Sequence, residues 1–276
     1  MTPFGTLYLI PAPLSDAPLT EALPHGALEL ISRLQYFVVE ELRTARRYLS
    51  KVHRLKTGPS KVHGLSKADP LEGGGWIDRL QLSILNEHTH YKELEELLQP
   101  LVDGRDVGLL SEAGLPAVAD PGAAFVALAH QKGIKVTPMT GPSSLMLALM
   151  ASGLNGQSFA FVGYLPVHQH ERKSKIREIE KRMVQEEQTQ IFMETPYRNL
   201  ALLGDLLEVC APQTLLCIAS NLTATDAFIA TKTIAQWRAA PTPPIHKVPT
   251  VFLVGRTVGA DVHVRPHLKG AFEKNK

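Results

Sequence analysis

Residues 107–122 read VGLLSEAGLPAVADPG, an apolar run that leads into a loop of small residues. The run at 107–110 has no polar alternation, which is typical of a strand buried on both faces of a parallel sheet. Small side chains in the loop let backbone amides approach a ligand closely, and ligands of open α/β sheets bind beyond the carboxyl ends of the strands. We interpret Asp120-Pro121-Gly122 mainly as the cap of the next helix, because Asp is a good N-cap.

The same pattern continues on both sides of this stretch. Apolar runs at 7–10, 36–39 and 135–139 alternate with helical patterns, which predicts parallel strands joined by crossover helices. After Gly153 the runs lie closer together, and the last ones are expected to pair antiparallel. The predicted fold class is therefore α/β with two α/β domains. Residues 1–141 would hold a mainly parallel sheet and residues 142–276 a mixed sheet, with the boundary at a Gly-Pro turn.

Composition limits the classes of function. The 276 residues include 29 Lys and Arg against 27 Asp and Glu, a formal charge of +2, so any nucleic-acid contact has to be local. Two isolated cysteines, Cys210 and Cys217, fit a reducing compartment better than a disulfide framework. The apolar start is cut by Pro11 and Pro13, so neither a signal peptide nor a membrane span is expected. We predict a cytoplasmic protein.

The common catalytic motifs are missing from the sequence. It has no glycine-rich dinucleotide fingerprint, P-loop, zinc-protease helix or nucleophile elbow. His88 and His90 have an H-x-H spacing without an evident third ligand, so no metal site is predicted. Their segment, 86–90, is interpreted either as a substrate-facing loop, with His88 as the contact, or as the capped start of a helix. Residues 56–76 are long and irregular, and predict either a functional lid or a disordered loop.

One segment is strongly basic. Residues 43–56 hold six Lys or Arg and no acidic residue. Cations at this density track phosphates, so Arg43, Arg46 and Arg47 are candidate RNA contacts, and Tyr48 is a candidate for stacking on a base. A surface helix with basic solvent-facing residues would give the same pattern.

Several motifs, taken in order, resemble the tetrapyrrole methylase superfamily of AdoMet-dependent methyltransferases. They are 7–13 (LYLIPAP), 111–116 (SEAGLP) with 120–122 (DPG), 141–144 (GPSS), 159–166 (FAFVGYLP) and 194–198 (ETPYR). The set is most similar to the branch that contains the small-subunit ribosomal RNA ribose 2′-O-methyltransferases. The resemblance implies a homodimer of two-domain chains, with S-adenosyl-L-methionine (AdoMet) in a cofactor cleft between the domains and RNA or a ribosomal subunit as partner.

The resemblance also implies which residues bind AdoMet. In the first domain and the turn that ends it they are Ile10, Pro11, Glu112, Gly114, Leu115, Val118, Ser143 and Ser144. In the second domain they are Tyr164, Leu165 and Leu222, for which core packing at strand ends is the alternative interpretation.

Methyl transfer to a ribose hydroxyl needs a positioned base, and Glu40, at the end of a predicted strand, is the candidate catalytic residue. An ion pair with Arg43 or Arg46 is its alternative role. The Asp and His that the ribosomal RNA branch carries after its second strand are absent from 40–47, which leaves the substrate open. RNA methylation is the leading prediction. The alternatives are methylation of a tetrapyrrole or another small molecule, and a catalytically idle AdoMet-binding or RNA-binding module.

Overall fold

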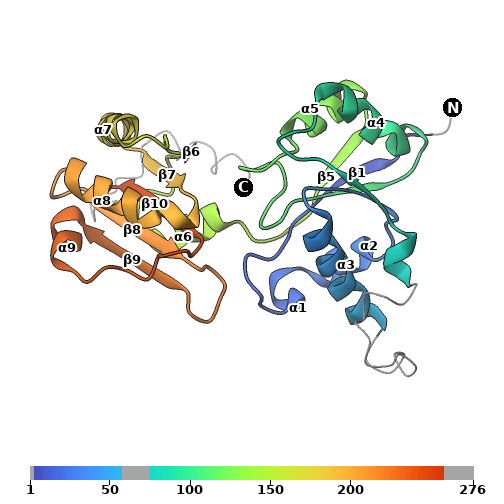
Figure 1. Cartoon of the computed structure of the whole chain (residues 1–276), viewed down its shortest axis with the longest axis horizontal. Coiled ribbons are helices and arrows are strands. Elements are labelled where there is room, and N and C mark those ends of the chain that lie inside the picture. Colours follow the sequence, from blue (N-terminus) through green and yellow to red (C-terminus); the bar gives the residue numbers. More distant parts are fainter. Residues whose placement is uncertain (1–2, 58–74, 258–276) are drawn as a thin grey trace, which may run out of the picture. The chain divides into compact units, whose positions relative to one another are not determined.

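The computed structural model describes residues 3–57 and 75–257 (Figure 1). The chain divides into two compact units, Met1–Ser143 and Ser144–Lys276, each with its own five-stranded sheet. The first sheet is parallel and the second is mixed, so the predicted α/β class is confirmed. Most of the loop predicted at 56–76 falls outside the described residues. Within the described ranges, no helix has the length and apolar character needed to cross a membrane.

The sheet of the first unit is parallel throughout. Its strands are β1 (Thr6–Ile10), β2 (Tyr36–Val39), β3 (Gln81–Ile84), β4 (Val107–Leu110) and β5 (Lys135–Pro138). They lie in the order β3-β2-β4-β1-β5. Because every neighbouring pair is parallel, all five carboxyl ends lie at one edge of the sheet.

Helices cover both faces of this sheet (Figure 1). They are α1 (Leu19–Ala22), α2 (His25–Ile31), α3 (Leu42–Thr57), α4 (Tyr91–Val102) and α5 (Ala123–Gln131), with a 3-10 turn, η2 (Trp76–Arg79). Ile10 faces a core shared with α1, α2 and α3, whereas Leu7 faces a core shared with α4 and α5. The neighbouring strands β1 and β4 are thus followed by helices on opposite faces. This arrangement is a topological switch point, where open α/β sheets bind ligands.

The start of α5 corrects one prediction. The helix begins at Ala123, and its N-cap is Gly122, which has φ 129° and supplies no side-chain cap. Ala117 and Ala119 also have positive φ values, 65° and 63°. The backbone therefore keeps turning until Gly122. The N-cap lies within the predicted tripeptide, but at Gly122, so the role given to the Asp120 side chain is wrong.

The sheet of the second unit is mixed. Its strands are β6 (Phe159–Tyr164), β7 (Thr189–Met193), β8 (Leu215–Ser220), β9 (Phe228–Thr233) and β10 (Thr250–Gly255). The order is β6-β7-β10-β8-β9, and only β6 and β7 are parallel neighbours. Since β10 is antiparallel to both β7 and β8, the strands β6, β7 and β8 run in one direction, and their carboxyl ends share an edge.

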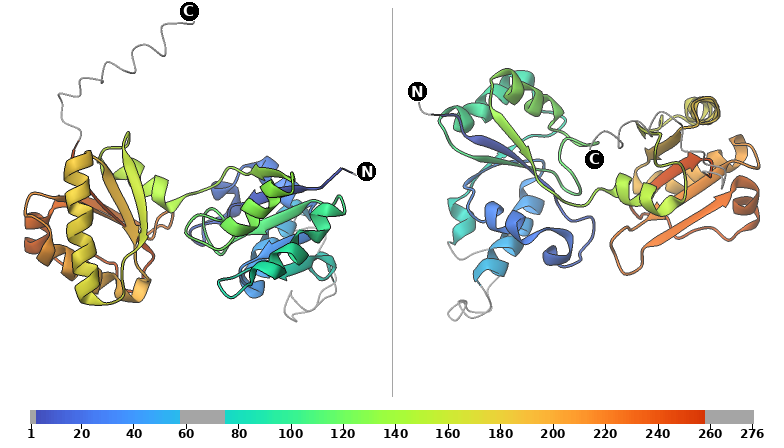
Figure 2. Two further views of the ribbon diagram at one scale, coloured as in Figure 1. Left: turned by 90° about the horizontal axis from the view of Figure 1, so that it is seen from above. Right: turned by 180° about the vertical axis from the view of Figure 1, so that it is seen from behind.

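The helices of the second unit are α6 (Ser144–Ser152), α7 (Gln169–Glu186), α8 (Asn199–Val209) and α9 (Ile234–Ala239), with a 3-10 turn, η3 (Pro196–Arg198). Helices α7, α8 and α9 share a core with Phe192 and Phe252, and α6 packs on the opposite face of the sheet (Figure 2). Helix α7 is amphipathic, since it buries Ile176, Ile179 and Met183 along one face.

Helix α7 also buries one charged residue, Arg172. Its burial is not predicted by the spacing of the apolar residues. Arg172 bonds to the carboxylate of Asp205 in α8 at 2.6 and 2.7 Å. Its guanidinium also donates to the carbonyls of Pro166 and Val167. A buried ion pair needs such additional bonds to offset its desolvation. Arg172 therefore fixes the segment that follows β6.

Candidate functional site

Three turns meet at the carboxyl edge of the first sheet. They follow β1, β4 and β5, and the first two are joined by an isolated antiparallel bridge between Ala12 and Gly114. The Ala12 amide donates to the Gly114 carbonyl at 2.8 Å, and the Gly114 amide donates back at 3.0 Å. Gly114 has φ +73°, a left-handed conformation that favours glycine. The bridge therefore fixes the loop of small residues against the end of β1.

The turn after β5 approaches the same point. A Cβ added to Gly141 would lie 2.2 and 2.3 Å from the Cβ and Cγ of Pro11, so only glycine permits this approach. From the other side, the Tyr48 hydroxyl of α3 donates to the Pro11 carbonyl at 3.1 Å. Pro11 and the bridge beside it are thus held from three directions.

Tyr48 is buried. Its ring packs among the buried residues beside α1 and α2, and burial raises the pKa of its hydroxyl. A base cannot stack on a ring in that position, so the prediction that Tyr48 contacts RNA bases is wrong. The apolar spacing of Ala45, Tyr48, Leu49 and Val52 is the signal that predicts its burial.

Glu40 lies immediately after β2 at this edge. Its Oε2 accepts a hydrogen bond from the Glu112 amide at 3.3 Å, and its own amide donates to Leu110. Burial is the main cause that raises the pKa of Glu40, followed by the Asp120 carboxylate, while the bond from Glu112 lowers it. Its partner in the structure is therefore the Glu112 backbone, in place of the ion pair with Arg43 or Arg46 that was the alternative.

Further carboxyl groups surround Glu40. Burial raises the pKa of Asp120, and the nearby charge of Glu112 raises it further. Thr44 donates weakly to Glu112 at 3.4 Å. In the part of the chain that the structure describes, no group of three or more His, Cys, Asp or Glu is placed to hold a metal ion. The field at this edge is negative and favours a ligand that carries positive charge.

The other predicted residues of the first unit are placed as follows. The side chains of Ile10 and Pro11 are buried, so any ligand contact there uses backbone atoms. Val118 is 44% exposed, and Leu115 and Ser143 are half-buried. Arg43, Arg46 and Arg47 are exposed on α3.

His88 belongs to the turn before α4. It is exposed, its amide donates to Asn86 Oδ1, and its Nε2 lies 3.7 Å from Glu87 Oε1. His90 is the N-cap of α4, and its amide donates to Glu93 Oε2 at 2.9 Å. The interpretation of this segment as a capped helix start is confirmed, while the role of His88 stays a prediction.

Two of the predicted residues of the second unit, Tyr164 and Leu222, lie at one edge of its sheet. Ser144 begins α6, Tyr164 ends β6, and Leu222 follows β8 at the edge where β6, β7 and β8 all end. Tyr164 is 52% exposed, whereas Leu165 is 3% exposed and belongs to the core. Core packing therefore describes the side chain of Leu165, and its backbone is the part that remains as a predicted contact.

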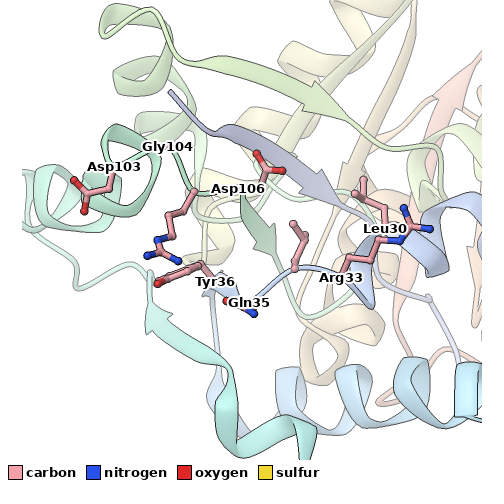
Figure 3. Close-up of a pocket in the computed structure, with 9 residues that line it drawn as sticks. Leu30, Arg33, Gln35, Tyr36, Asp103, Gly104 and Asp106 are labelled. Atoms are coloured by element: carbon pink, nitrogen blue, oxygen red, sulfur yellow. The ribbon is translucent and has the colours of Figure 1, made fainter. Parts of the chain in front are cut away.

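A groove of about 580 Å³ lies at the opposite, amino edge of the first sheet (Figure 3). Arg33, Tyr36, Arg105 and Asp106 help to line it, and the Arg105 guanidinium lies 5.6 Å from the Tyr36 ring centroid. It contains none of the residues predicted from sequence. The candidate site is therefore the carboxyl edge, where the bridge and Glu40 are brought together.

Comparison with known proteins gives a consistent result. The model of the family described as Tetrapyrrole (Corrin/Porphyrin) Methylases matches residues 6–237. Ribosomal RNA small subunit methyltransferase I of Vibrio cholerae is 29% identical over 219 residues, 79% of this chain and 65% of the relative. The protein of the same name from Halalkalibacterium halodurans is 28% identical over 205 residues, 74% of this chain and 60% of the relative. The matched region thus spans less than two thirds of either relative.

A solved structure shares the fold. The cobalt precorrin-4 methyltransferase of cobalamin biosynthesis is 14% identical, with a TM-score of 0.52, and the match covers 91% of this chain and 94% of that one. At this identity the likeness concerns the arrangement of helices and strands.

The contact between Gly141 and Pro11 gives a stability prediction. Gly141→Ala should lower the free energy of unfolding by about 1–3 kcal/mol, because the new methyl group overlaps the Pro11 ring. Gly26→Ala is the matched control, since its Cβ would meet nothing within 4 Å inside α2, and it should be neutral or stabilising. Urea unfolding followed by circular dichroism measures both. Equal stability of the two variants would show that the turns do not pack as described.

Proposed function

Because the chain belongs to the tetrapyrrole methylase family, we propose that it is an AdoMet-dependent methyltransferase that acts on RNA, with a ribose 2′-hydroxyl of small-subunit ribosomal RNA as the leading substrate. The observation that carries the proposal is the meeting of three strand-end turns at the switch point of the parallel sheet. The names of the relatives support ribosomal RNA as the substrate. We further propose a cytoplasmic homodimer whose partner is RNA or a ribosomal subunit.

The residues present fit AdoMet. When bound, AdoMet supplies an electrophilic methyl group on a positively charged sulfonium. The carboxylates of Glu40, Glu112 and Asp120 create the negative field that such a cation needs. Gly114 is buried and bonded to Ala12, while the loop around it is open at Leu115 and Val118. The backbone of Pro11 and Gly114 would form the floor of the cofactor site in the first unit, and Leu115 and Val118 would contact the cofactor.

Glu40 is the base of the proposed reaction. A carboxylate with a raised pKa has a higher proton affinity, which suits it to accept a proton from a hydroxyl group. The methyl carbon would exchange its bond to sulfur for one to the ribose oxygen, which would leave the electron pair on a neutral thioether. The ribose proton would pass to Oε1 of Glu40, the oxygen that does not accept the Glu112 bond. That bond holds the carboxylate in one orientation while the proton is transferred.

The basic face of α3 supports an RNA substrate. Arg43, Arg46 and Arg47 lie at helical spacing on the side opposite the buried Ala45, Tyr48 and Leu49. Helix α3 begins at Leu42, directly after Glu40 and Glu41. A phosphate backbone that follows this face therefore leads toward the proposed base.

The proposed function is tested by two measurements on the full chain. Isothermal calorimetry should detect AdoMet binding at cofactor concentrations up to about 1 mM. Labelled methyl groups should then enter the RNA fraction of an extract from cells that lack the protein. Label in a small-molecule fraction would identify the tetrapyrrole-type alternative. Absence of both heat and label would leave only a module without methyltransferase activity.

The base is tested by Glu40→Gln. The variant should still bind AdoMet, while methyl transfer to RNA falls by about 10²–10⁴-fold, because the amide cannot accept the proton. Single-turnover kinetics at saturating cofactor measure the step. Undiminished transfer would exclude Glu40.

Asp120→Asn is the electrostatic companion to that variant. The Asp120 carboxylate raises the pKa of Glu40, so its removal should lower that pKa. Because Glu40 works in its deprotonated form, the rate falls as the pH drops through its pKa, and this acid limb should move to lower pH in the variant. Asp103→Asn, at the amino edge, should leave the limb in place. A shift in both variants, or in neither, contradicts the assignment.

The basic face is tested by the double variant Arg46→Glu, Arg47→Glu. Its affinity for single-stranded RNA should fall, and the slope of log K against log salt should shrink by about 0.7 for each lost phosphate contact. The control is Arg33→Glu, Arg105→Glu, which changes the same charge at the opposite edge of the sheet (Figure 3). Fluorescence anisotropy across a salt series compares them. An effect of equal size in the control would indicate net charge alone.

A further inference from the structure

Two segments of the second unit are tied together at the end of β7. The side chain of Asn199, fully buried at the start of α8, donates to the carbonyls of Ile245 and Val248 at 3.0 and 2.7 Å. The Lys247 amide donates to the Pro196 carbonyl at 3.1 Å. These bonds hold residues 245–248 rigidly against the turn η3.

The turn η3 carries an exposed aromatic ring, that of Tyr197. Tyr197, in the middle of η3, is 76% exposed, and the Lys247 ammonium lies 5.6 Å from its ring centroid. Lys247 has φ 59°, a left-handed conformation that residues other than glycine rarely adopt. Strain of this kind persists only where the surrounding contacts impose it, and it is concentrated at functional sites. Here those contacts bring a cation beside an exposed ring.

In these two segments the acidic side chain is buried and the basic side chains reach solvent. The Glu194 side chain is fully buried and bonds to Arg198 at 2.5 Å, while the Arg198 side chain is 34% exposed. Lys247 and His246 are exposed. Glu194 is the only acidic residue in 194–199 and 245–250, so these segments present cations and one aromatic ring to solvent, and no carboxylate.

We propose that Tyr197 and Lys247 form a contact for single-stranded RNA in the second unit, in which a base stacks on the ring and a phosphate binds the ammonium. The inference rests on the proposed function, since it adds a substrate contact to that activity. An aromatic ring beside cations is the combination that binds single-stranded nucleic acid, whereas an apolar protein partner does not require the cations. The contact follows β7, at the edge where β6 ends with Tyr164.

The test uses the full chain and a fluorescein-labelled single-stranded RNA of about 12 nucleotides. Tyr197→Leu should raise the Kd about tenfold, because a stacked base is lost, and Tyr197→Phe should stay within about twofold of the original chain. Lys247→Gln should reduce the salt slope by about 0.7, which is one phosphate contact. Calorimetry should show unchanged AdoMet binding in all three variants.

The controls lie in the same unit at the opposite edge. Phe159→Leu removes a 40%-exposed ring at the start of β6, and Lys181→Gln removes an exposed charge on α7; neither should change RNA affinity. If Tyr197→Leu binds RNA as the original chain does, the contact is wrong, while methyl transfer by the original chain keeps the proposed function. If the variant instead changes the sedimentation coefficient at constant RNA affinity, the surface joins two copies of the chain and the inference is overturned.

Two further results separate the inference from the proposed function. If the original chain binds RNA but transfers no methyl group, the proposed function is wrong. The RNA affinities of Tyr197→Leu and Tyr197→Phe still test the RNA contact in that case. An original chain that binds AdoMet but no RNA at low salt removes the contact together with the RNA substrate. Circular dichroism of each variant checks that the fold is retained, and Tyr197→Phe provides a folded comparison with the ring present.

Discussion

The candidate site depends on one backbone contact, the pair of hydrogen bonds between Ala12 and Gly114. Parallel strands bring their carboxyl ends to a common edge, but the chain after each strand is free to leave in any direction. At the switch point the chains after β1 and β4 depart toward opposite faces, and this bridge joins them before they separate. Gly141 permits the third turn to close on Pro11. The site is therefore assembled from backbone, which explains why small residues dominate its motifs.

The charges beside that bridge are separated by sign. Carboxyl groups crowd the strand ends, where burial and mutual repulsion raise the pKa of Glu40 and of Asp120. Glu41 is different, because bonds from the amides of Arg43 and Thr44 at the start of α3 lower its pKa. The basic side chains then continue along the exposed face of the same helix. A cationic cofactor requires a negative field, whereas a polyanionic substrate requires a positive one. In our proposal the carboxylates at the strand ends provide the first and the basic face of α3 provides the second.

Much of this was predictable from the sequence, for a definable reason. Buried parallel strands are continuous apolar runs, and the loops after them are marked by Gly, Ser and Pro, so β1, β2, β4 and the loops that converge were all expected. What was missed depends on partners distant in sequence. For Tyr48, the spacing with Ala45 and Leu49 already indicates burial, and only its hydrogen bond to the Pro11 carbonyl requires the fold. The burial of Arg172 could not be predicted, because α7 contains many charged residues and its partner, Asp205, lies in another helix. Asp120 is a local case, because positive φ values at Ala117, Ala119 and Gly122 place the helix start beyond it.

The motif at 194–198 illustrates the same limit in the second unit. Its residues alone do not reveal which side chains face inward, since Glu, Tyr and Arg are all common at surfaces. The structure turns Glu194 inward, where it holds Arg198, and Asn199 then secures the strained loop that carries Lys247. An inward carboxylate keeps the cation in place without adding negative charge to the surface, so the outer face stays suited to phosphate. This polar segment thus has two parts: the buried side chains of Glu194 and Asn199, and the exposed Tyr197 ring with the cations beside it. The bonds of the buried side chains fix the position of the ring, which lowers the entropy cost of stacking a base on it.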